Sequence, residues 1–213
     1  MLKNGLRLLV ITATMLSVPA IHSLYSAPSA SEDCAAAASW AKAHASTLPT
    51  DLAAFAKHPR LRRVAIFNAL SPEIKVSLWK QQLTRFRELN RLTDVQQSLL
   101  ARAEATLTPD AYLLPPTRDT LGPQIRAAFE RRHWAVFADL GSVFGARDTH
   151  EPEQLTLTSL ISAEVLMAET CSCSITSDYC SIGYECRNPT NCAYVSGCGT
   201  FWQYNCVGTC QDA

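Results

Sequence analysis

The hydrophobic and polar positions that follow Ser71 have the period of an α-helix. Apolar side chains recur at steps of three or four residues, which places them on one face of a helix. This stripe consists of Val76, Trp79, Leu83 and Phe86. Ser71 precedes Pro72, and a capping residue before a proline is typical of a helix start. The pattern therefore predicts a helix that begins at Pro72.

A second stripe follows at steps of four residues. Thr93 and Gln96 have the spacing of a capping box, which predicts a new helix start. The stripe consists of Val95, Leu99, Ala103 and Leu107. Prolines at positions 109, 115, 116 and 123 then predict a longer connection around residues 108–123.

Further amphipathic segments extend the helical pattern in both directions. We expect helices over residues 33–45 and 157–165, and a long amphipathic segment over residues 125–144. Good helix formers dominate this region, and no glycine occurs between Ser31 and Leu121. Residues 31–170 are thus predicted to form a mainly α, bundle-like helical domain, large enough to bury its own core.

The composition changes abruptly at Cys171. The last 43 residues contain no leucine, methionine, lysine or histidine. So short a segment, poor in aliphatic side chains, gains too little from apolar burial to offset its chain entropy. Disulfides contribute about 2–4 kcal/mol each, so we expect them to hold residues 171–213 as a separate small domain. Asn188-Pro189 and Gly197-Cys198-Gly199 predict tight turns between short strands.

Eight cysteines occupy this tail. We expect disulfides at Cys171, Cys173, Cys180, Cys186, Cys192, Cys198, Cys206 and Cys210. The spacing lacks the C-x2-C motif and the histidines typical of zinc sites or redox motifs, so no metal or cofactor is predicted. The pairing stays open, except that Cys171 and Cys173 are too close to bond to each other. Cys34 is either an inert thiol at a helix start or a transient partner while the tail oxidises.

The N-terminus predicts export. Lys3 and Arg7 precede an uncharged run over residues 8–20, which is too short to span a bilayer and is typical of a secretory signal. We therefore assign residues 1–30 to a signal peptide and expect a secreted protein, with an uncleaved anchor as the alternative. Oxidation of the tail cysteines is expected outside the cytoplasm.

Charge and motifs argue against several functions. Nineteen basic residues balance nineteen acidic ones, so no nucleic-acid partner is expected. His44, His58, His133 and His150 are scattered and belong to no catalytic motif, so we predict no catalytic residues and no enzyme. The basic pairs at 62–63 and 131–132 lie in helical stretches and are expected on solvated helix faces.

Several segments carry a resemblance to a known family. The tail segments 171–174, 176–180, 192–194 and 197–200, together with residues 67–75, resemble precursors of the fulvocin C-related bacteriocin family. The resemblance implies a signal, a helical leader and a C-terminal antibacterial peptide that begins near residues 167–170. It also implies signal peptidase, a processing protease and a target on competing bacteria as partners.

The tail's charge and aromatic residues bear on how it could act. One arginine against three acidic residues gives the tail a net charge of −2, so attraction to anionic membranes cannot drive its binding. Phe201, Trp202 and Tyr204 form an amphipathic cluster suited to contact a membrane or target. Alternatively, these aromatics cover the disulfides in a miniature core.

We therefore predict a secreted bacteriocin-like precursor. The competing hypothesis is a secreted, non-toxic structural or binding module whose disulfide-rich cap is never cleaved. The two differ in processing, because only the first releases a peptide of the size of the tail.

Overall fold

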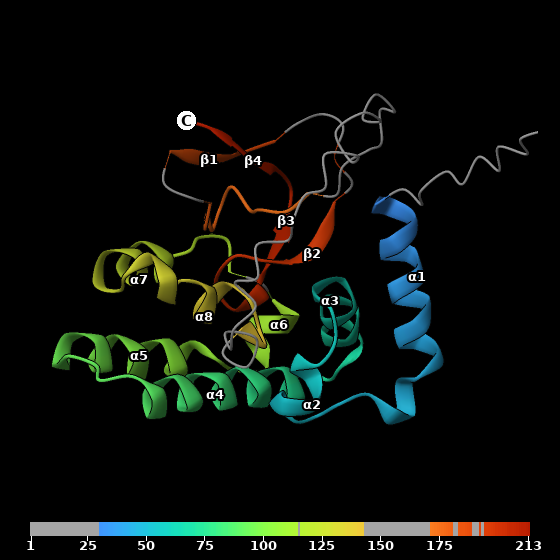
Figure 1. The fold of residues 1–213 in the computed structure, drawn as a ribbon, viewed down its shortest axis with the longest axis horizontal. Helices are drawn as coiled ribbons and strands as arrows, with labels where there is room; N and C mark the ends of the chain where they lie inside the picture. Colours follow the sequence, from blue (N-terminus) through green and yellow to red (C-terminus); the bar gives the residue numbers. More distant parts are fainter. Residues whose placement is uncertain (1–29, 115, 143–170, 181–182, 189–191, 193) are drawn as a thin grey trace, which may run out of the picture.

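The computed structural model describes residues 30–114, 116–142, 171–180, 183–188, 192 and 194–213 (Figure 1). The α-helices are α1 (Ala30–Ala43), α2 (Leu52–Ala56), α3 (Arg60–Ala69), α4 (Pro72–Leu89), α5 (Asp94–Thr106), α6 (Asp110–Leu113), α7 (Gly122–Ala128) and α8 (Ala135–Ala138). Short 3-10 turns, η1 (Ala45–Thr47) and η2 (Arg131–His133), lie among them. The predicted mainly α fold with a small disulfide-rich C-terminal part is confirmed.

Helices α4 and α5 form where their sequence signals predict. Ser71 caps α4 by accepting a hydrogen bond from the amide of Ile74, and Pro72 is the first residue of the helix. Thr93 and Gln96 form the predicted capping box at the start of α5. All four side chains of the α4 stripe are buried, whereas Val95 at the start of the α5 stripe is 70% exposed. The face of α5 that packs against the core therefore begins at Leu99, one turn later than predicted.

The amphipathic segment over residues 125–144 is broken into short pieces, unlike the long segment expected. Phe129 and Glu130 adopt extended backbone conformations, which end α7 and separate it from η2 and α8. The indole of Trp134 donates to the carbonyl oxygen of Phe129 at 3.0 Å and so satisfies a group freed by the break. The expected helix over residues 157–165 lies outside the described residues.

Gln82 and Arg63 tie the end of this broken segment to the longer helices. The buried side chain of Gln82 in α4 donates to the carbonyl of Val136 at 2.7 Å and accepts from the amide of Gly141 at 2.6 Å. Arg63 in α3 was expected on a solvated face, but it is buried and pairs with Asp139 at 3.1 Å. Arg63 can be buried because the Asp139 carboxylate offers its guanidinium a charged partner.

The tail consists of short antiparallel strands. Among the described residues, β1 (Tyr184–Arg187) pairs with β4 (Thr209–Asp212), and β2 (Val195–Cys198) pairs with β3 (Tyr204–Cys206). The turn η4 (Thr200–Trp202) joins β2 to β3. The short strands agree with the prediction, but the predicted turns do not carry over. Gly197 and Cys198 belong to β2, so the turn starts only at Gly199, and the turn predicted at Asn188-Pro189 lies partly outside the described residues. Figure 1 shows β1 and β4 at the outer end of the molecule and β3 reaching toward the helices.

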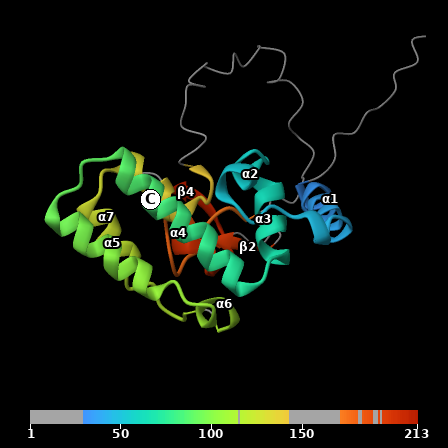
Figure 2. The same cartoon turned by 90° about the horizontal axis from the view of Figure 1, so that it is seen from below.

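The tail and the helices share one hydrophobic core. Phe201 and Trp202 from η4 belong to the same cluster of buried side chains as residues of α2, α3, α4, α5 and α8. Viewed from below, α4 and α5 lie side by side on one face of the molecule, with tail strands behind α4 (Figure 2). The two parts predicted as separate domains are therefore joined by a common interior.

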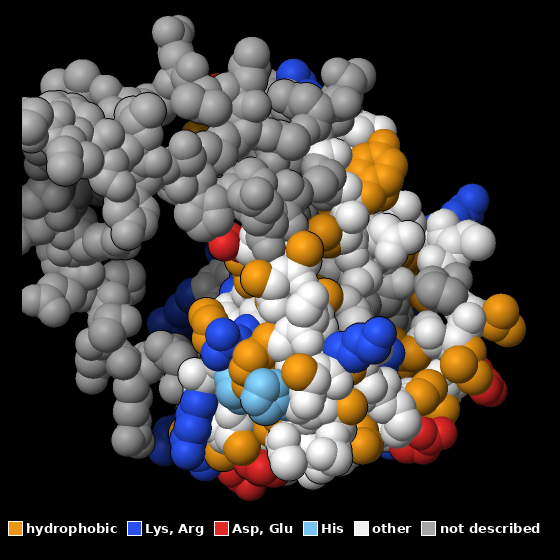
Figure 3. Space-filling view, turned by 90° about the vertical axis from the view of Figure 1, so that its right-hand side faces the viewer, with side chains coloured by type: hydrophobic (Ala, Val, Ile, Leu, Met, Phe, Trp, Pro, Cys, Tyr) orange, Lys and Arg blue, Asp and Glu red, His pale blue; other side chains and the backbone are white. Residues whose placement is uncertain are grey.

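The described helices and one face of the molecule bear on contact with a membrane. No helix there combines the length and apolarity needed to cross a bilayer. On the face seen in Figure 3, lysine and arginine side chains are scattered among hydrophobic and uncharged ones.

Candidate functional site: the seam between the tail and the helices

The turn between β2 and β3 has an unusual backbone. Phe201 and Trp202 have φ angles of 56° and 53°, and Gly199 has a φ of 67°. The left-handed region costs a non-glycine residue about 1–2 kcal/mol, so two consecutive aromatic residues there need compensation. The Cys198–Cys206 disulfide closes the hairpin that contains this turn. The hairpin thus carries two adjacent, conformationally constrained aromatic side chains.

Rings from four helices, α2, α3, α4 and α8, surround these two side chains. The Phe201 ring lies edge-on to Trp79 of α4, with centroids 5.2 Å apart, and 6.3 Å from Phe137 of α8. The Trp202 ring lies perpendicular to Phe67 of α3 at 5.3 Å. Edge-to-face aromatic pairs of this kind contribute about 0.5–1.5 kcal/mol beyond their buried area. Phe201 is 0% and Trp202 4% exposed, so the turn is anchored inside the helical part.

Polar groups of Phe201 and Trp202 also form hydrogen bonds across the boundary between the tail and the helices. The Trp202 indole N–H donates to the carbonyl oxygen of Ala138 at 2.8 Å. The Tyr112 hydroxyl of α6 donates to the carbonyl oxygen of Phe201 at 3.2 Å. Because an unpaired buried donor or acceptor costs about 1–3 kcal/mol, these bonds make the burial of the turn favourable.

Asp119, in the connection before α7, is the polar centre of the contact between the tail and the helices. Its carboxylate accepts from the amides of Leu121 at 3.0 Å and Gly122 at 2.7 Å. From the tail it accepts the hydroxyls of Ser177 and of Thr200, the latter at 2.8 Å. Two donors come from each side, so this buried carboxylate joins the tail to the helical part through charge-assisted hydrogen bonds.

Tyr179 and Gly199 complete the polar centre. The hydroxyl of Tyr179 lies 2.9 Å from that of Thr200, and burial is the main cause that raises the pKa of Tyr179 above its usual range. A Cβ atom at Gly199 would lie 2.4 Å from the Cβ of Ser177. Only glycine, which also tolerates the positive φ, allows the turn to approach Ser177 so closely.

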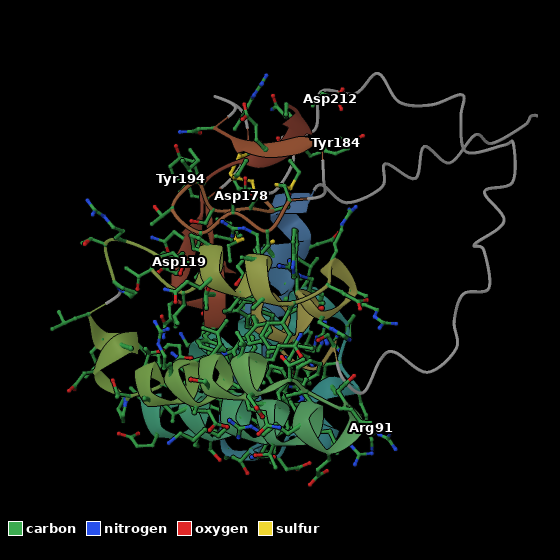
Figure 4. All side chains as sticks on the ribbon, turned by 90° about the vertical axis from the view of Figure 1, so that its left-hand side faces the viewer. Arg91, Asp119, Asp178, Tyr184, Tyr194 and Asp212 are labelled. Carbon is green, nitrogen blue, oxygen red and sulfur yellow. A yellow bond between two sulfur atoms is a disulfide. The ribbon has the colours of Figure 1, made fainter. Side chains whose placement is uncertain are left out.

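Two contacts flank the centre. Arg126 of α7 donates to the backbone carbonyl of Asp178, and its guanidinium lies 5.4 Å from the centroid of the Tyr179 ring. Asn68 of α3 donates to the hydroxyl of Ser196 in β2 at 2.6 Å. We call the set formed by Asp119, Ser177, Thr200, Phe201 and Trp202, with these neighbours, the seam. Figure 4 shows Asp119 where the tail meets the helices, and Tyr184 and Asp212 at the outer end of the tail.

The eight tail cysteines form four disulfides. The pairs are Cys171–Cys192, Cys173–Cys186, Cys180–Cys210 and Cys198–Cys206. The sulfur atoms of Cys173, Cys180 and Cys210 lie within 4.8 Å of one another, a spacing that could suit a metal ion. All three are bonded in disulfides, and a disulfide sulfur lacks the thiolate charge that makes cysteine a metal ligand.

His44, His58, His133 and Cys34 make contacts other than those of the seam, and His150 lies outside the described residues. His44 stacks on Trp40 with ring centroids 4.3 Å apart, and His58 lies 5.4 Å from the same ring. His133 lies edge-on to Phe86 at 5.2 Å. Cys34 lies in α1 and lines a cavity between α1, α3 and β2.

Comparison with known proteins identifies one relationship. Bacteriocin fulvocin-C of Myxococcus fulvus is 54% identical to this chain over 35 residues, which make up 78% of the bacteriocin and 16% of the chain. The chain belongs to the fulvocin-C family. The likeness covers only those 35 residues, or 16% of the chain. No family model matches, and no solved structure matches.

In this fulvocin-C relative, the aromatic cluster expected to face a membrane or target lies inside the intact chain. Phe201, Trp202 and Tyr204 are all buried. The exposed interface predicted for them therefore does not describe the uncut protein and stays a prediction for a severed tail. The alternative of a miniature core within the tail is also incomplete, because Phe201 and Trp202 join the core of the helices.

The large apolar and aromatic side chains that the tail does expose are different ones. Ile175 is 53%, Tyr184 48% and Tyr194 65% exposed. Tyr184 and Tyr194 project from the tail in Figure 4. Sequence reasoning also missed Asp119, because an isolated aspartate in a proline-rich connection has no motif that marks it.

Proposed function

We propose that this chain is the precursor of a bacteriocin-like peptide, with the disulfide-rich tail as the antibacterial part and the helical part as its leader. The main support for this proposal is the 54% identity to bacteriocin fulvocin-C over 78% of the length of that protein. The four disulfides support the proposal, because such bonds persist in the oxidising compartments where a secreted toxin acts. The signal-like N-terminus supports export by the general secretory route.

The tail is proposed to act through a specific target on competing bacteria rather than through charge. Its net charge of −2 provides no attraction to anionic lipids, each cation being worth about 1 kcal/mol at such a surface. The exposed Tyr184 and Tyr194, and the anchor residues once exposed, offer aromatic contact area at low entropic cost. No catalytic step is part of the proposal.

A second candidate function is a secreted binding module that keeps its disulfide-rich cap. One observation favours it specifically: the anchor residues Phe201 and Trp202 lie in the core of the helices. Removing the tail would expose the helical side of that core to water, at about 25 cal/mol per Å² of apolar surface. A cap that completes the core of its own domain would have a reason to remain attached.

Processing and killing distinguish the two candidates. The full chain is expressed with export into an oxidising compartment, and the supernatant is analysed by intact mass spectrometry with and without reduction and alkylation. The precursor proposal expects a peptide cut near residues 167–170, lighter than its reduced form by the mass of eight hydrogen atoms. The isolated peptide should inhibit indicator bacteria, and its alkylated form should not. Recovery of the uncut chain alone, with an inactive tail, would establish the binding module instead.

A further inference from the structure

We propose that the helical part is a binding partner for the tail, so that a chain cut between residues 142 and 171 persists as a non-covalent complex. The proposal concerns association, and it holds whether or not the tail kills bacteria. It assigns to the helices an activity beyond that of a disposable leader: recognition of a disulfide-closed hairpin that presents two aromatic side chains.

The apolar contact has the character of a binding hot spot. Trp202 lies among rings of α2, α3 and α4, with centroid distances of 6.4 Å to Phe55, 5.3 Å to Phe67 and 6.0 Å to Trp79. Hot spots are enriched in tryptophan held in fully desolvated, centrally placed pockets. The tail has no leucine or methionine with which to cover these rings itself. The helical part provides the surface that the hairpin needs.

Hydrogen bonds across the boundary add specificity. Asp119 accepts from Ser177 and Thr200, the indole of Trp202 donates to Ala138, and Arg126 donates to the carbonyl of Asp178. Each of these bonds joins the tail to a residue between 119 and 138. None requires the chain to be continuous between residues 142 and 171, so a cut there leaves all of them in place.

The hairpin is pre-organised for binding. The Cys198–Cys206 disulfide closes a loop with a sequence separation of 8, and every disulfide in the tail joins two tail residues. A ligand already fixed in its bound conformation loses little entropy on association. The disulfide fixes the closed loop before binding, whereas the positive φ angles of Phe201 and Trp202 carry a strain that their burial against the helices offsets.

One consequence rests on the proposed bacteriocin function. Proteolysis alone would not release the tail, and Phe201 and Trp202 would stay hidden until a second event separates the pieces. A competing apolar surface, such as a lipid interface or a hydrophobic receptor groove, has the chemistry to take over these two side chains.

Size-exclusion chromatography of cut chain tests the association. A recognition sequence for a site-specific protease is placed between residues 150 and 160 of the full chain, and complete cutting is verified on a denaturing, non-reducing gel. At a sample concentration of about 1 μM we expect both pieces to elute together in equal amounts, which requires a dissociation constant below that concentration. Separate elution of a correctly oxidised tail would overturn the proposal.

Matched variants locate the contact. Trp202→Ala in the cuttable chain should weaken the association at least about 30-fold, the threshold of a hot spot. Tyr184→Ala, which removes a 48% exposed aromatic side chain at the outer end of the same tail, should change it less than about 2-fold. Equal effects of the two substitutions would contradict recognition through the anchor.

A milder variant keeps the test informative if Trp202→Ala does not fold. Thr200→Val preserves the shape of the side chain but removes one donor to Asp119, and it should weaken the association about 10-fold or more. Retention of wild-type affinity by this correctly oxidised variant would show that the polar centre of the seam plays no part in binding. Growth inhibition is measured separately with tail isolated under denaturing conditions and refolded, so failure of association and failure of toxicity remain distinguishable.

Discussion

The helical part and the tail acquire a fixed shape by different physical means. In the helical part, side chains such as Leu78, Leu83 and Leu100 are fully buried and form a close-packed aliphatic and aromatic core. In the tail, buried disulfide sulfurs fill the small clusters where another domain would place aliphatic residues. The first mechanism stabilises the folded state through contacts, and the second mainly restricts the unfolded state.

The tail therefore depends on the helices for part of its stability. Its disulfides fix where the strands lie relative to one another, but Phe201 and Trp202 find their apolar surroundings among the helices. The helical part in turn has those two side chains within its own core. Cross-links and apolar burial are therefore combined across the seam, and substitutions there should affect both parts of the protein.

Replacing the anchor should give the largest effect on stability. Phe201→Ala should lower the free energy of unfolding by about 3–5 kcal/mol, because it leaves a cavity against Trp79 and Phe137. The loss should appear in the helical signal at 222 nm during urea unfolding, although the substitution is in the tail. Tyr184→Ala, at a 48% exposed position, is the control and should change stability by less than about 0.5 kcal/mol. A helical transition unaffected by Phe201→Ala would show that the two parts are independent.

Removing the disulfides one at a time should show whether each stabilises the tail through loop entropy alone or also by holding Phe201 and Trp202 in place. Loop entropy alone predicts a loss of about 3.6 kcal/mol for Cys180–Cys210, with a sequence separation of 30, and about 2.5 kcal/mol for Cys198–Cys206, with a separation of 8. Paired serine variants, compared by urea unfolding, measure both. If the hairpin must be closed to hold Phe201 and Trp202, the shorter loop will cost more than its length predicts. Costs that follow loop length alone would contradict that role.

The polar centre of the seam should contribute less than the aromatic anchor. Thr200→Val should cost about 1.5–3 kcal/mol, the usual range for a hydrogen bond to a charged group. Ser196→Ala removes another bond across the boundary, to Asn68, but this pair is exposed to solvent and should cost less than about 0.5 kcal/mol. Chemical unfolding of both variants provides the comparison, and equal losses would argue against a special role for the buried carboxylate of Asp119.

Local signals explain which helices could be predicted. Ser71, Thr93 and Gln96 cap helices through neighbours three residues away, so the starts of α4 and α5 are encoded within a few positions. The break after Ala128 is not local in that sense. Gln96 donates to the carbonyl oxygen of Ala128 across 32 positions, and Trp134 donates to that of Phe129. Such tertiary partners for free carbonyls do not appear in an amphipathic pattern.

The seam shows the same limit at larger sequence distances. The eight cysteines were identifiable as disulfide partners from count, spacing and expected compartment, but their pairing depends on which strands meet. Asp119 meets Ser177 and Thr200 across 58 and 81 positions. Phe201 and Trp202 could be recognised as important from their chemistry, whereas the surface they contact is set by the packing of four helices.

Raising the pH should lower the free energy of unfolding through the buried tyrosines at the seam, and this is the smallest of the expected effects. Burial raises the pKa of Tyr112 and of Tyr179 above the ordinary value of 10.0, so the folded protein keeps these protons where the unfolded chain releases them. Stability is therefore complete below about pH 10 and falls as the pH rises further, by about 1.4 kcal/mol per tyrosine at pH 11. Tyr179→Phe removes one titrating group. At pH 8 the variant should be less stable than wild type, because the bond to Thr200 is lost. Between pH 9 and 11 its free energy of unfolding should fall by about 1.4 kcal/mol less than that of the wild type. Urea unfolding at each pH measures both slopes. Parallel slopes would mean that the Tyr179 hydroxyl reaches water in the folded state, and that the tail is bound to the helices less tightly than its contacts indicate.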